Sequence, residues 1–221
     1  IPPTSSRFRL GFWQVSSLNA QGQENRFEVA QSRGEMEADE EIVARWMAGR
    51  QTTDLELLVR RYGSRFLRSA QAMLGNTVEA EDVSQEALLR MVRALPKFQG
   101  RSSFGTWSFT ILLNTVRSSL QRQQAPGQQT VSESIVTEVP VDAPVDRSLL
   151  ALELRSIMAE AVDQLPPKQK VAIVLVELEG FSVAEAAQIE QCSPKAMQQR
   201  LIDARSSLRR HTGLKRHWNG E

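Results

Sequence analysis

A group of polar and basic side chains near the C-terminal end of the sequence has the residue types and the spacing needed to read DNA. Its members are Ser193, Lys195, Gln198, Gln199, Arg200, Ile202 and Arg205. Glutamine and arginine form paired hydrogen bonds with base edges, lysine and arginine bind phosphates, and apolar side chains contact the methyl group of thymine. The pattern favours DNA binding. The alternative is the ordinary solvated face of two packed helices.

The surrounding residues predict two helices joined by a tight turn. Ser182 with Glu185 three residues later forms a capping box, and Ser193 followed by Pro194 is a typical helix start. We therefore expect helices over residues 182–190 and 193–210. Their shared apolar positions are Val183, Ala187, Ile189, Met197, Leu201, Ala204 and Leu208. With these residues in a common core, the polar side chains face outward, as on the recognition helix of a helix-turn-helix.

A second group of candidate functional residues lies between residues 76 and 122 and combines aromatic with basic side chains. Phe104, Trp107 and Phe109 are available to stack on unpaired bases, which is worth about 1–3 kcal/mol per base. Phe104 and Trp107 also share helical spacing with Ile111, so packing in a core is the alternative, and we expect Phe109 in the core. Five cations are placed to follow phosphates: Arg93, Lys97, Arg101, Arg117 and Arg122.

The elements that carry both groups are all expected to be helices, because apolar residues recur with a helical period from Met36 onward. The expected ranges are 39–49 with Asp39 as the N-cap, 55–75, 78–95, 103–122, 149–163 and 166–179. No segment alternates with period two for long, so no sheet is expected. The fold class is all-α, with two small helical domains.

Three stretches break this pattern. Residues 1–35 are polar without a period and are expected to be disordered, with the native start at or near Met36. Residues 123–147 contain breaker residues and acids and are expected to form a flexible linker. Residues 212–221 are expected to be a frayed tail.

Composition excludes several classes of function. The formal net charge is +1, and Cys192 is the only cysteine, so a disulfide within the chain and a cysteine-rich zinc site are ruled out. The two histidines, His211 and His217, lie at the C-terminal end, and the sequence has no phosphate-binding loop. We therefore expect no catalytic residue, no metal, no cofactor and no small-molecule substrate. No apolar run approaches the length of a membrane span, and we expect a cytoplasmic protein.

Two sets of motifs together resemble a known family. The first set is Glu81-Asp82-Val83-Ser84-Gln85-Glu86-Ala87-Leu88, Phe98-Gln99-Gly100, Ser103-Phe104-Gly105-Thr106-Trp107 and Asn114, which is similar to region 2 of the extracytoplasmic-function (ECF) sigma factors. The second set, from Leu165-Pro166 through Arg205, is similar to region 4 of the same family. The resemblance implies a region 2 helical bundle over 36–122 and a region 4 helix-turn-helix over 148–211.

The resemblance also implies partners and roles. Asp82, Gln85 and Glu86 would dock the β′ clamp coiled coil of core RNA polymerase. Gln99, Gly100, Arg101, Ser102, Ser103, Phe104, Trp107, Asn114 and Arg117 would bind the −10 promoter element, flip a base and hold the melted non-template strand. The group from Ser193 to Arg205 would bind the −35 element. The polymerase β flap and an anti-sigma factor are further expected partners.

The recognition helix departs from the family pattern. Ala196 and Met197 replace a usual Thr-Val pair, Gln198 and Gln199 replace a common basic residue and a serine, and Asp203 stands where arginine is frequent. A carboxylate there would repel phosphate unless it is paired.

Two alternative functions stay open: a stand-alone helix-turn-helix regulator, and a sigma-like protein that only sequesters partners.

Overall fold

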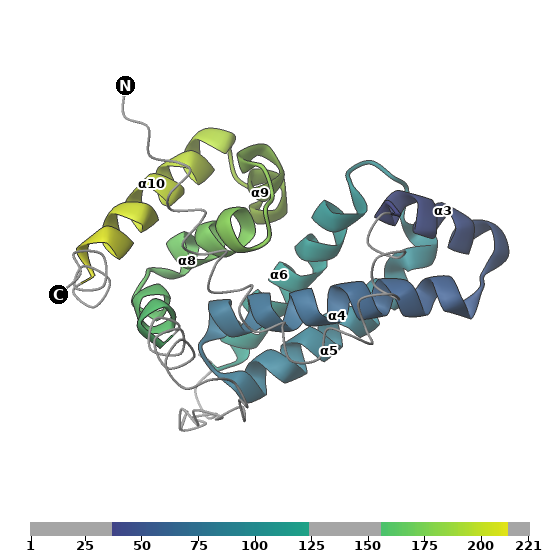
Figure 1. The fold of residues 1–221 in the computed structure, drawn as a ribbon, viewed down its shortest axis with the longest axis horizontal. Coiled ribbons are helices and arrows are strands. Elements are labelled where there is room, and N and C mark those ends of the chain that lie inside the picture. Colours follow the sequence, from purple (N-terminus) through teal and green to yellow (C-terminus); the bar gives the residue numbers. More distant parts are fainter. Residues whose placement is uncertain (1–36, 124–155, 212–221) are drawn as a thin grey trace, which may run out of the picture.

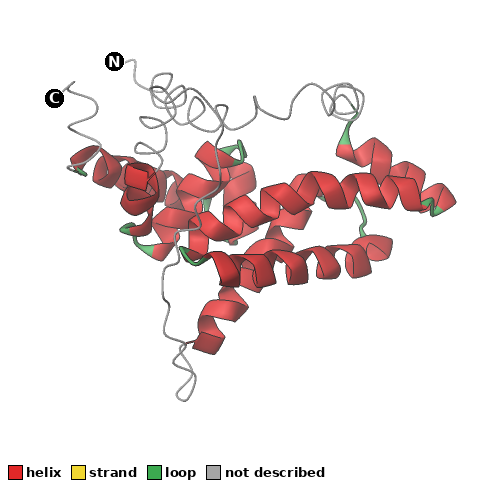
Figure 2. Cartoon of the chain, turned by 60° about the horizontal axis from the view of Figure 1, so that its bottom comes forward, coloured by secondary structure: helices red, strands yellow, loops and turns green. Residues whose placement is uncertain are grey.

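The described part of the chain, residues 37–123 and 156–211 of a computed structural model, is built from helices (Figures 1 and 2). The elements are α3 (Asp39–Gly49), α4 (Thr52–Leu74), α5 (Thr77–Ala94), the 3-10 turn η1 (Leu95–Lys97), α6 (Phe104–Gln123), helical residues 156–163, α8 (Pro167–Ile173), the π-helical turn η2 (Val174–Leu178), α9 (Val183–Glu190) and α10 (Pro194–Arg210). No strand occurs within these two ranges, and the all-α prediction is confirmed. The expected leader, most of the expected linker and the expected tail lie outside the described residues.

Local sequence signals account for most helix boundaries. Gly75, with φ +72°, ends α4 in the left-handed conformation that glycine adopts without a steric penalty. Asn76 then caps α5 by accepting a hydrogen bond from the Glu79 N–H at 3.2 Å. The prediction that Asp39 is an N-cap is wrong, because Ala38 holds that position. Asp39 is instead the first residue of α3, where its carboxylate accepts hydrogen bonds from the side chains of Arg61 and Tyr62.

Aromatic side chains form the core of the N-terminal module, which comprises α3 to α6. Tyr62, Phe66, Phe104 and Phe109 are fully buried. Tyr62 meets Phe104 edge-to-face with ring centroids 5.2 Å apart, and Phe66 meets Phe109 at 5.4 Å. Such geometry stabilises a pair by about 0.5–1.5 kcal/mol beyond the area buried. The rings thereby fix α6 against α4.

The C-terminal module, residues 156–211, contains the predicted helix-turn-helix. Ser182 and Glu185 form the expected capping box, and the Ser193 hydroxyl caps α10 by accepting from the Ala196 N–H at 3.2 Å. The predicted core residues other than Val183 are fully buried, and Val183 is partly buried. The helix expected up to residue 179 differs, because α8 ends at Ile173 and continues as η2, in which the Glu179 N–H donates to the Val174 carbonyl at 3.0 Å.

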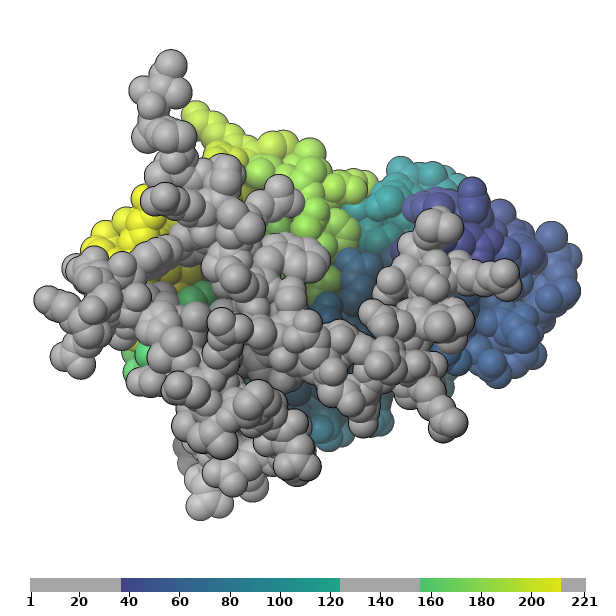
Figure 3. All heavy atoms as spheres, in the orientation of Figure 1, coloured from purple at the N-terminus to yellow at the C-terminus, as the bar shows by residue number. Residues whose placement is uncertain are grey.

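The two modules pack against one another, which the sequence pattern did not predict (Figures 1 and 3). The Phe181 ring, which follows η2, lies edge-on to Phe109 with centroids 5.0 Å apart. It also lies so close to α6 that a Cβ added at Gly105 would be 3.4 Å from a Phe181 ring carbon. Arg65 and Ser69 of α4 each donate to the Glu179 carboxylate at 2.8 Å. The modules therefore share one continuous core.

Candidate nucleic-acid interface

The outward face of α10 is the first candidate surface. Lys195, Gln198, Gln199 and Ile202 are exposed, as the helix-turn-helix pattern predicted. Ile202 is 49% exposed, which leaves a methyl-bearing surface among hydrogen-bonding groups. This combination suits contact with base edges and thymine methyl groups in a major groove.

Two arginines of α10 are held by carboxylates that lie inside the module. The Arg205 Nε donates to Glu177 Oε1 at 3.0 Å, and the Arg200 Nη1 donates to Glu190 Oε1 at 3.1 Å. The side chains of Glu177 and Glu190 are only 5% and 7% exposed. A guanidinium has five N–H groups, so each arginine keeps donors for another ligand. The carboxylates therefore orient the arginines without using up their hydrogen-bonding capacity.

These two glutamates were missed by the sequence reasoning. A signal was present, since Glu177 interrupts the apolar run Val174-Leu175-Val176 and Glu190 follows Ile189 at the end of α9. Charged residues at core-facing positions are buried only when they are paired. An acid in such a place therefore indicates an arginine or lysine partner elsewhere in the fold.

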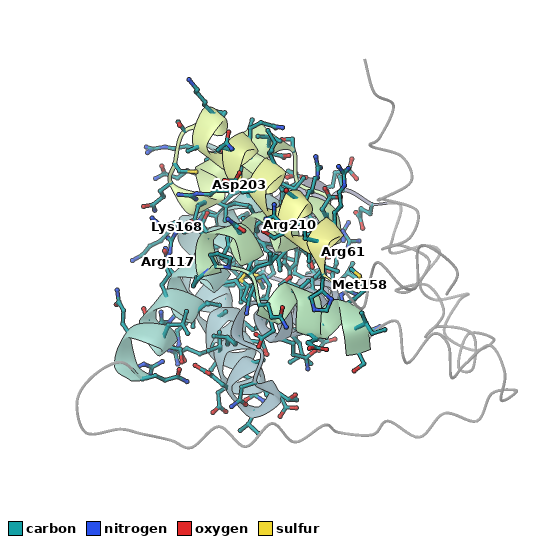
Figure 4. All side chains as sticks on the ribbon, turned by 90° about the vertical axis from the view of Figure 1, so that its left-hand side faces the viewer. Arg61, Arg117, Met158, Lys168, Asp203 and Arg210 are labelled. Atoms are coloured by element: carbon teal, nitrogen blue, oxygen red, sulfur yellow. The ribbon has the colours of Figure 1, made fainter. Side chains whose placement is uncertain are left out.

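Asp203 is exposed on α10 and accepts a hydrogen bond from the Gln199 amide at 2.9 Å. Figure 4 shows it with the C-terminal helices in front of the N-terminal module. The Asp203 carboxylate thus has a side-chain partner one turn away, but that partner is neutral and leaves the negative charge in place. The predicted unfavourable effect on phosphate binding stays a prediction.

The second candidate surface begins at the turn between η1 and α6. Gln99, Gly100 and Arg101 are exposed, and Gly100 has φ +66° with open space around a notional Cβ. Backbone conformation, rather than crowding, therefore favours glycine here. Ser103 caps α6, since its hydroxyl accepts from the Thr106 N–H at 3.2 Å. Ser102 precedes it and is half-buried.

The aromatic residues of this surface divide into two kinds. Phe109 is fully buried, as expected, and so is Phe104. In this conformation no base can reach the Phe104 ring, which makes it part of the core and not of the surface. Trp107 is half-buried and packs on Phe98 and Phe104 with centroids 5.1 and 5.4 Å away. Its remaining exposure makes it the aromatic group of α6 that is best placed to stack a base.

The polar residues of α6 follow Trp107 along the helix. Asn114 is exposed and Arg117 is partly buried. The Arg117 Nη2 donates to Glu190 Oε2 at 2.6 Å, so this predicted −10 residue contacts the C-terminal module. Four of the five predicted phosphate-binding cations are exposed, and only Arg117 among these five is partly buried.

A third surface lies on α5 and contains the predicted docking residues. Asp82 and Gln85 are exposed, and Glu86 pairs with Arg90 at 2.7 Å. Val78 and Leu89, 66% and 51% exposed, have the spacing that places them on the same face as Asp82 and Gln85. We call Val78, Asp82, Gln85 and Leu89 the α5 stripe. The α5 stripe thus presents exposed apolar and polar side chains on one face of the helix, and its two apolar members were not predicted.

The described residues carry no helix long and apolar enough to traverse a bilayer. They also contain no group of three or more His, Cys, Asp or Glu side chains that could hold a metal ion.

Comparison with known proteins identifies the class. Residues 58–125 match the family described as sigma-70 region 2, and residues 155–208 match sigma-70 region 4. The ECF RNA polymerase sigma-E factor of Escherichia coli is 30% identical over 178 residues, covering 77% of this chain and 92% of that protein. RNA polymerase sigma-H factor of Pseudomonas aeruginosa is 28% identical over 183 residues, covering 78% and 92%. The chain belongs to the ECF sigma factors of the sigma-70 family.

Solved structures share the fold. CnrH, solved with the cytosolic domain of CnrY, superimposes with a TM-score of 0.56 at 24% identity, covering 78% of this chain and 95% of that one. The sigma factor RpoE of Bartonella quintana, solved with the anti-sigma factor NepR, gives a TM-score of 0.59 at 24% identity, with 73% and 97% covered. Because both sigma regions occur in order in one chain, the stand-alone regulator is not favoured. The protein is an RNA polymerase sigma factor.

Proposed function

We propose that the three surfaces divide the work of transcription initiation. The α5 stripe together with Glu86 docks the β′ clamp coiled coil of core polymerase. The region 2 domain, residues 36–122, contacts the −10 element, and the region 4 domain, residues 148–211, contacts the −35 element and the β flap. The observation that carries the proposal is that exposed base-reading groups on α10 and an exposed polar-apolar stripe on α5 occur in one chain with both sigma regions.

Contact with the −35 element rests on the outward face of α10. Gln198 and Gln199 supply amide groups for base edges, and Ile202 supplies an apolar contact for a thymine methyl. Lys195, Arg200 and Arg205 supply cations for phosphates. Ser193 caps the N-terminus of α10, which faces the phosphate backbone of the DNA.

Contact with the −10 element rests on the turn at 99–103 and on α6. The exposed turn supplies backbone and side-chain polar groups around a flipped base, and Trp107 stacks on an unpaired base next to it. Asn114 and the cations Arg93, Lys97 and Arg101 lie along the path of the strand. Phe104 is left out of this set because it is buried.

We also propose an anti-sigma factor as a regulatory partner and the cytoplasm as the place of action. A similar structure, the Bartonella RpoE, was solved with an anti-sigma factor, and this supports the first part. The exposed apolar members of the α5 stripe are the surface such a partner would cover in competition with polymerase.

Transcription with purified core polymerase tests the stacking role. Trp107→Leu keeps an apolar side chain but removes the ring, so initiation on duplex promoter DNA should fall by about 5- to 150-fold, which corresponds to about 1–3 kcal/mol of stacking. A template with an unpaired −10 region should recover most of the loss, because melting is no longer required. Equal activity of the variant and the wild type on duplex DNA would contradict the role of Trp107.

Core binding tests the docking surface. Asp82→Ala combined with Leu89→Ala should weaken the affinity for core polymerase by about 30-fold or more, because two central interface residues that each contribute about 1–2 kcal/mol together contribute about 2–4 kcal/mol. The matched control is Arg60→Ala, an exposed change on α4. Unchanged affinity of the double variant would remove α5 from the docking surface, and no promoter-dependent transcript with any template would overturn the whole proposal.

A further inference from the structure

Glu190, the last residue of α9, is a carboxylate shared by two arginines from different modules. Its Oε2 accepts from Arg117 of α6 at 2.6 Å, and its Oε1 accepts from Arg200 of α10 at 3.1 Å. The Arg117 guanidinium also donates to the Glu190 backbone carbonyl at 3.3 Å. The Glu190 side chain is 7% exposed, and a carboxylate at that depth is stable only when it is paired. Both oxygens are therefore used, one for each module.

Both arginines are promoter-contact residues: the family resemblance implies a −10 role for Arg117, which we include in the proposed −10 contacts, and Arg200 belongs to the proposed −35 contacts. Because they bind one carboxylate, their bound nitrogens lie within roughly 8 Å of each other, the span of two hydrogen bonds and a carboxyl group. Promoter elements two helical turns of DNA apart are separated by about 70 Å. The packed arrangement therefore allows contact with one element at most.

We propose that Glu190 is a latch that holds the chain closed, and that the Arg117–Glu190 pair must break before both promoter elements are bound. The inference rests on the proposed division of promoter contacts between the modules. Arg200 lies in the same module as Glu190 and keeps its partner when the modules separate. Opening thus frees Arg117 for DNA, while Glu190 continues to orient Arg200.

The other contacts between the modules make the latch part of a larger interface. Phe181 packs on Phe109, and Glu179, whose side chain is 1% exposed, binds Arg65 and Ser69. The α5 stripe stays exposed in the closed chain, so polymerase can dock there before the modules separate. The closed form is therefore expected to bind core enzyme first and to open afterwards.

Distance measurements on the full chain test the latch directly. Spin labels are placed on cysteines introduced at the exposed positions Ser64 of α4 and Gln188 of α9, with Cys192→Ser to remove the native thiol. Glu190→Gln keeps the shape of the side chain and removes its charge. Glu160→Gln is the matched control, because Glu160 is exposed and its carboxylate is hydrogen-bonded, among the described residues, only to Gln164, in the turn that follows its own helix.

The wild-type chain and the control should give one short, narrow distance distribution. Glu190→Gln should raise the ratio of open to closed molecules by about five- to tenfold, which is the weakening expected for charged hydrogen bonds that are partly exposed. Phe181→Ala should open the chain independently, and core polymerase should open the wild type. These results would support the latch.

Two results would overturn it. One is a Glu190→Gln distribution identical to that of Glu160→Gln while Phe181→Ala opens the chain, because the carboxylate would then contribute nothing. The other is a wild-type chain that stays closed in a promoter complex in which both elements are protected. Failure of the proposed function would give a different result. The holoenzyme would then protect no promoter DNA, even though Glu190→Gln still shifted the measured distances between the spin labels.

Discussion

The Arg65–Glu179 ion pair joins α4 to the segment that follows η2, and its contribution to stability can be worked out from its surroundings. The Arg65 Nε lies 2.8 Å from Glu179 Oε2, and the two side chains are 24% and 1% exposed. Arg65 also lies over the rings of Tyr62, Phe109 and Phe181 at 5.2, 5.0 and 5.9 Å. The pair is therefore largely shielded from water and held in one orientation.

A double-mutant cycle with Arg65→Met and Glu179→Gln isolates the pair. Hydrogen bonds to charged groups contribute about 1.5–3 kcal/mol, so we expect a coupling free energy of roughly 1–3 kcal/mol in urea unfolding. The control cycle uses the exposed Arg90–Glu86 pair, at 43% and 40% exposure, for which about 0.5 kcal/mol or less is expected.

Comparing the coupling free energies of the two cycles tests whether the modules are packed against each other in solution. If the Arg65–Glu179 coupling were no larger than that of the exposed pair, the modules would not be packed in solution as they are in this structure. A large coupling that disappears when core polymerase is bound would show that the same contact breaks on activation.

Two further predictions concern local structure and the core. Ser182→Ala removes the capping box of α9 and should lower the free energy of unfolding by about 1 kcal/mol, while Ser182→Asp, which keeps an N-cap acceptor, should recover most of it in the same urea titration. Phe104→Ala should cost about 3–5 kcal/mol, measured by thermal unfolding, because the ring is fully buried between Tyr62, Phe98 and Trp107. A Phe104→Ala protein as stable as the wild type would return this residue to the DNA-contact surface.

Local signals explain what could be predicted from the sequence. Ser182, Ser193 and Pro194 specify the ends of α9 and α10 through hydrogen bonds and backbone geometry that span only three or four residues. The apolar period of α10 likewise fixes which side faces inward. The exposed face of the recognition helix follows from these two facts alone.

The contacts between the modules depend on residues far apart in the sequence, and no periodicity encodes them. Glu179 and Arg65 are 114 positions apart, and Glu190 and Arg117 are 73 apart. Helical spacing places Arg117 on a polar face equally well whether DNA or a glutamate is the partner. The role of Phe104 was ambiguous for the same reason, since its helical spacing from Trp107 and Ile111 suits both a buried core position and a stacking surface.

The π-helical turn η2 sets the direction of its own side chains relative to the chain that follows it. The extra residue in this turn lets Glu177 point toward Arg205 of α10 while Glu179, two positions later, meets Arg65 of α4. Deleting one residue from 174–178 would restore regular α-helical winding, and because a π-helical turn absorbs its extra residue locally, the chain after the turn would keep its orientation while side chains within the turn would change theirs. The deletion would therefore separate the Glu177–Arg205 contact from the contacts that Glu179 and Phe181 make with α4 and α6.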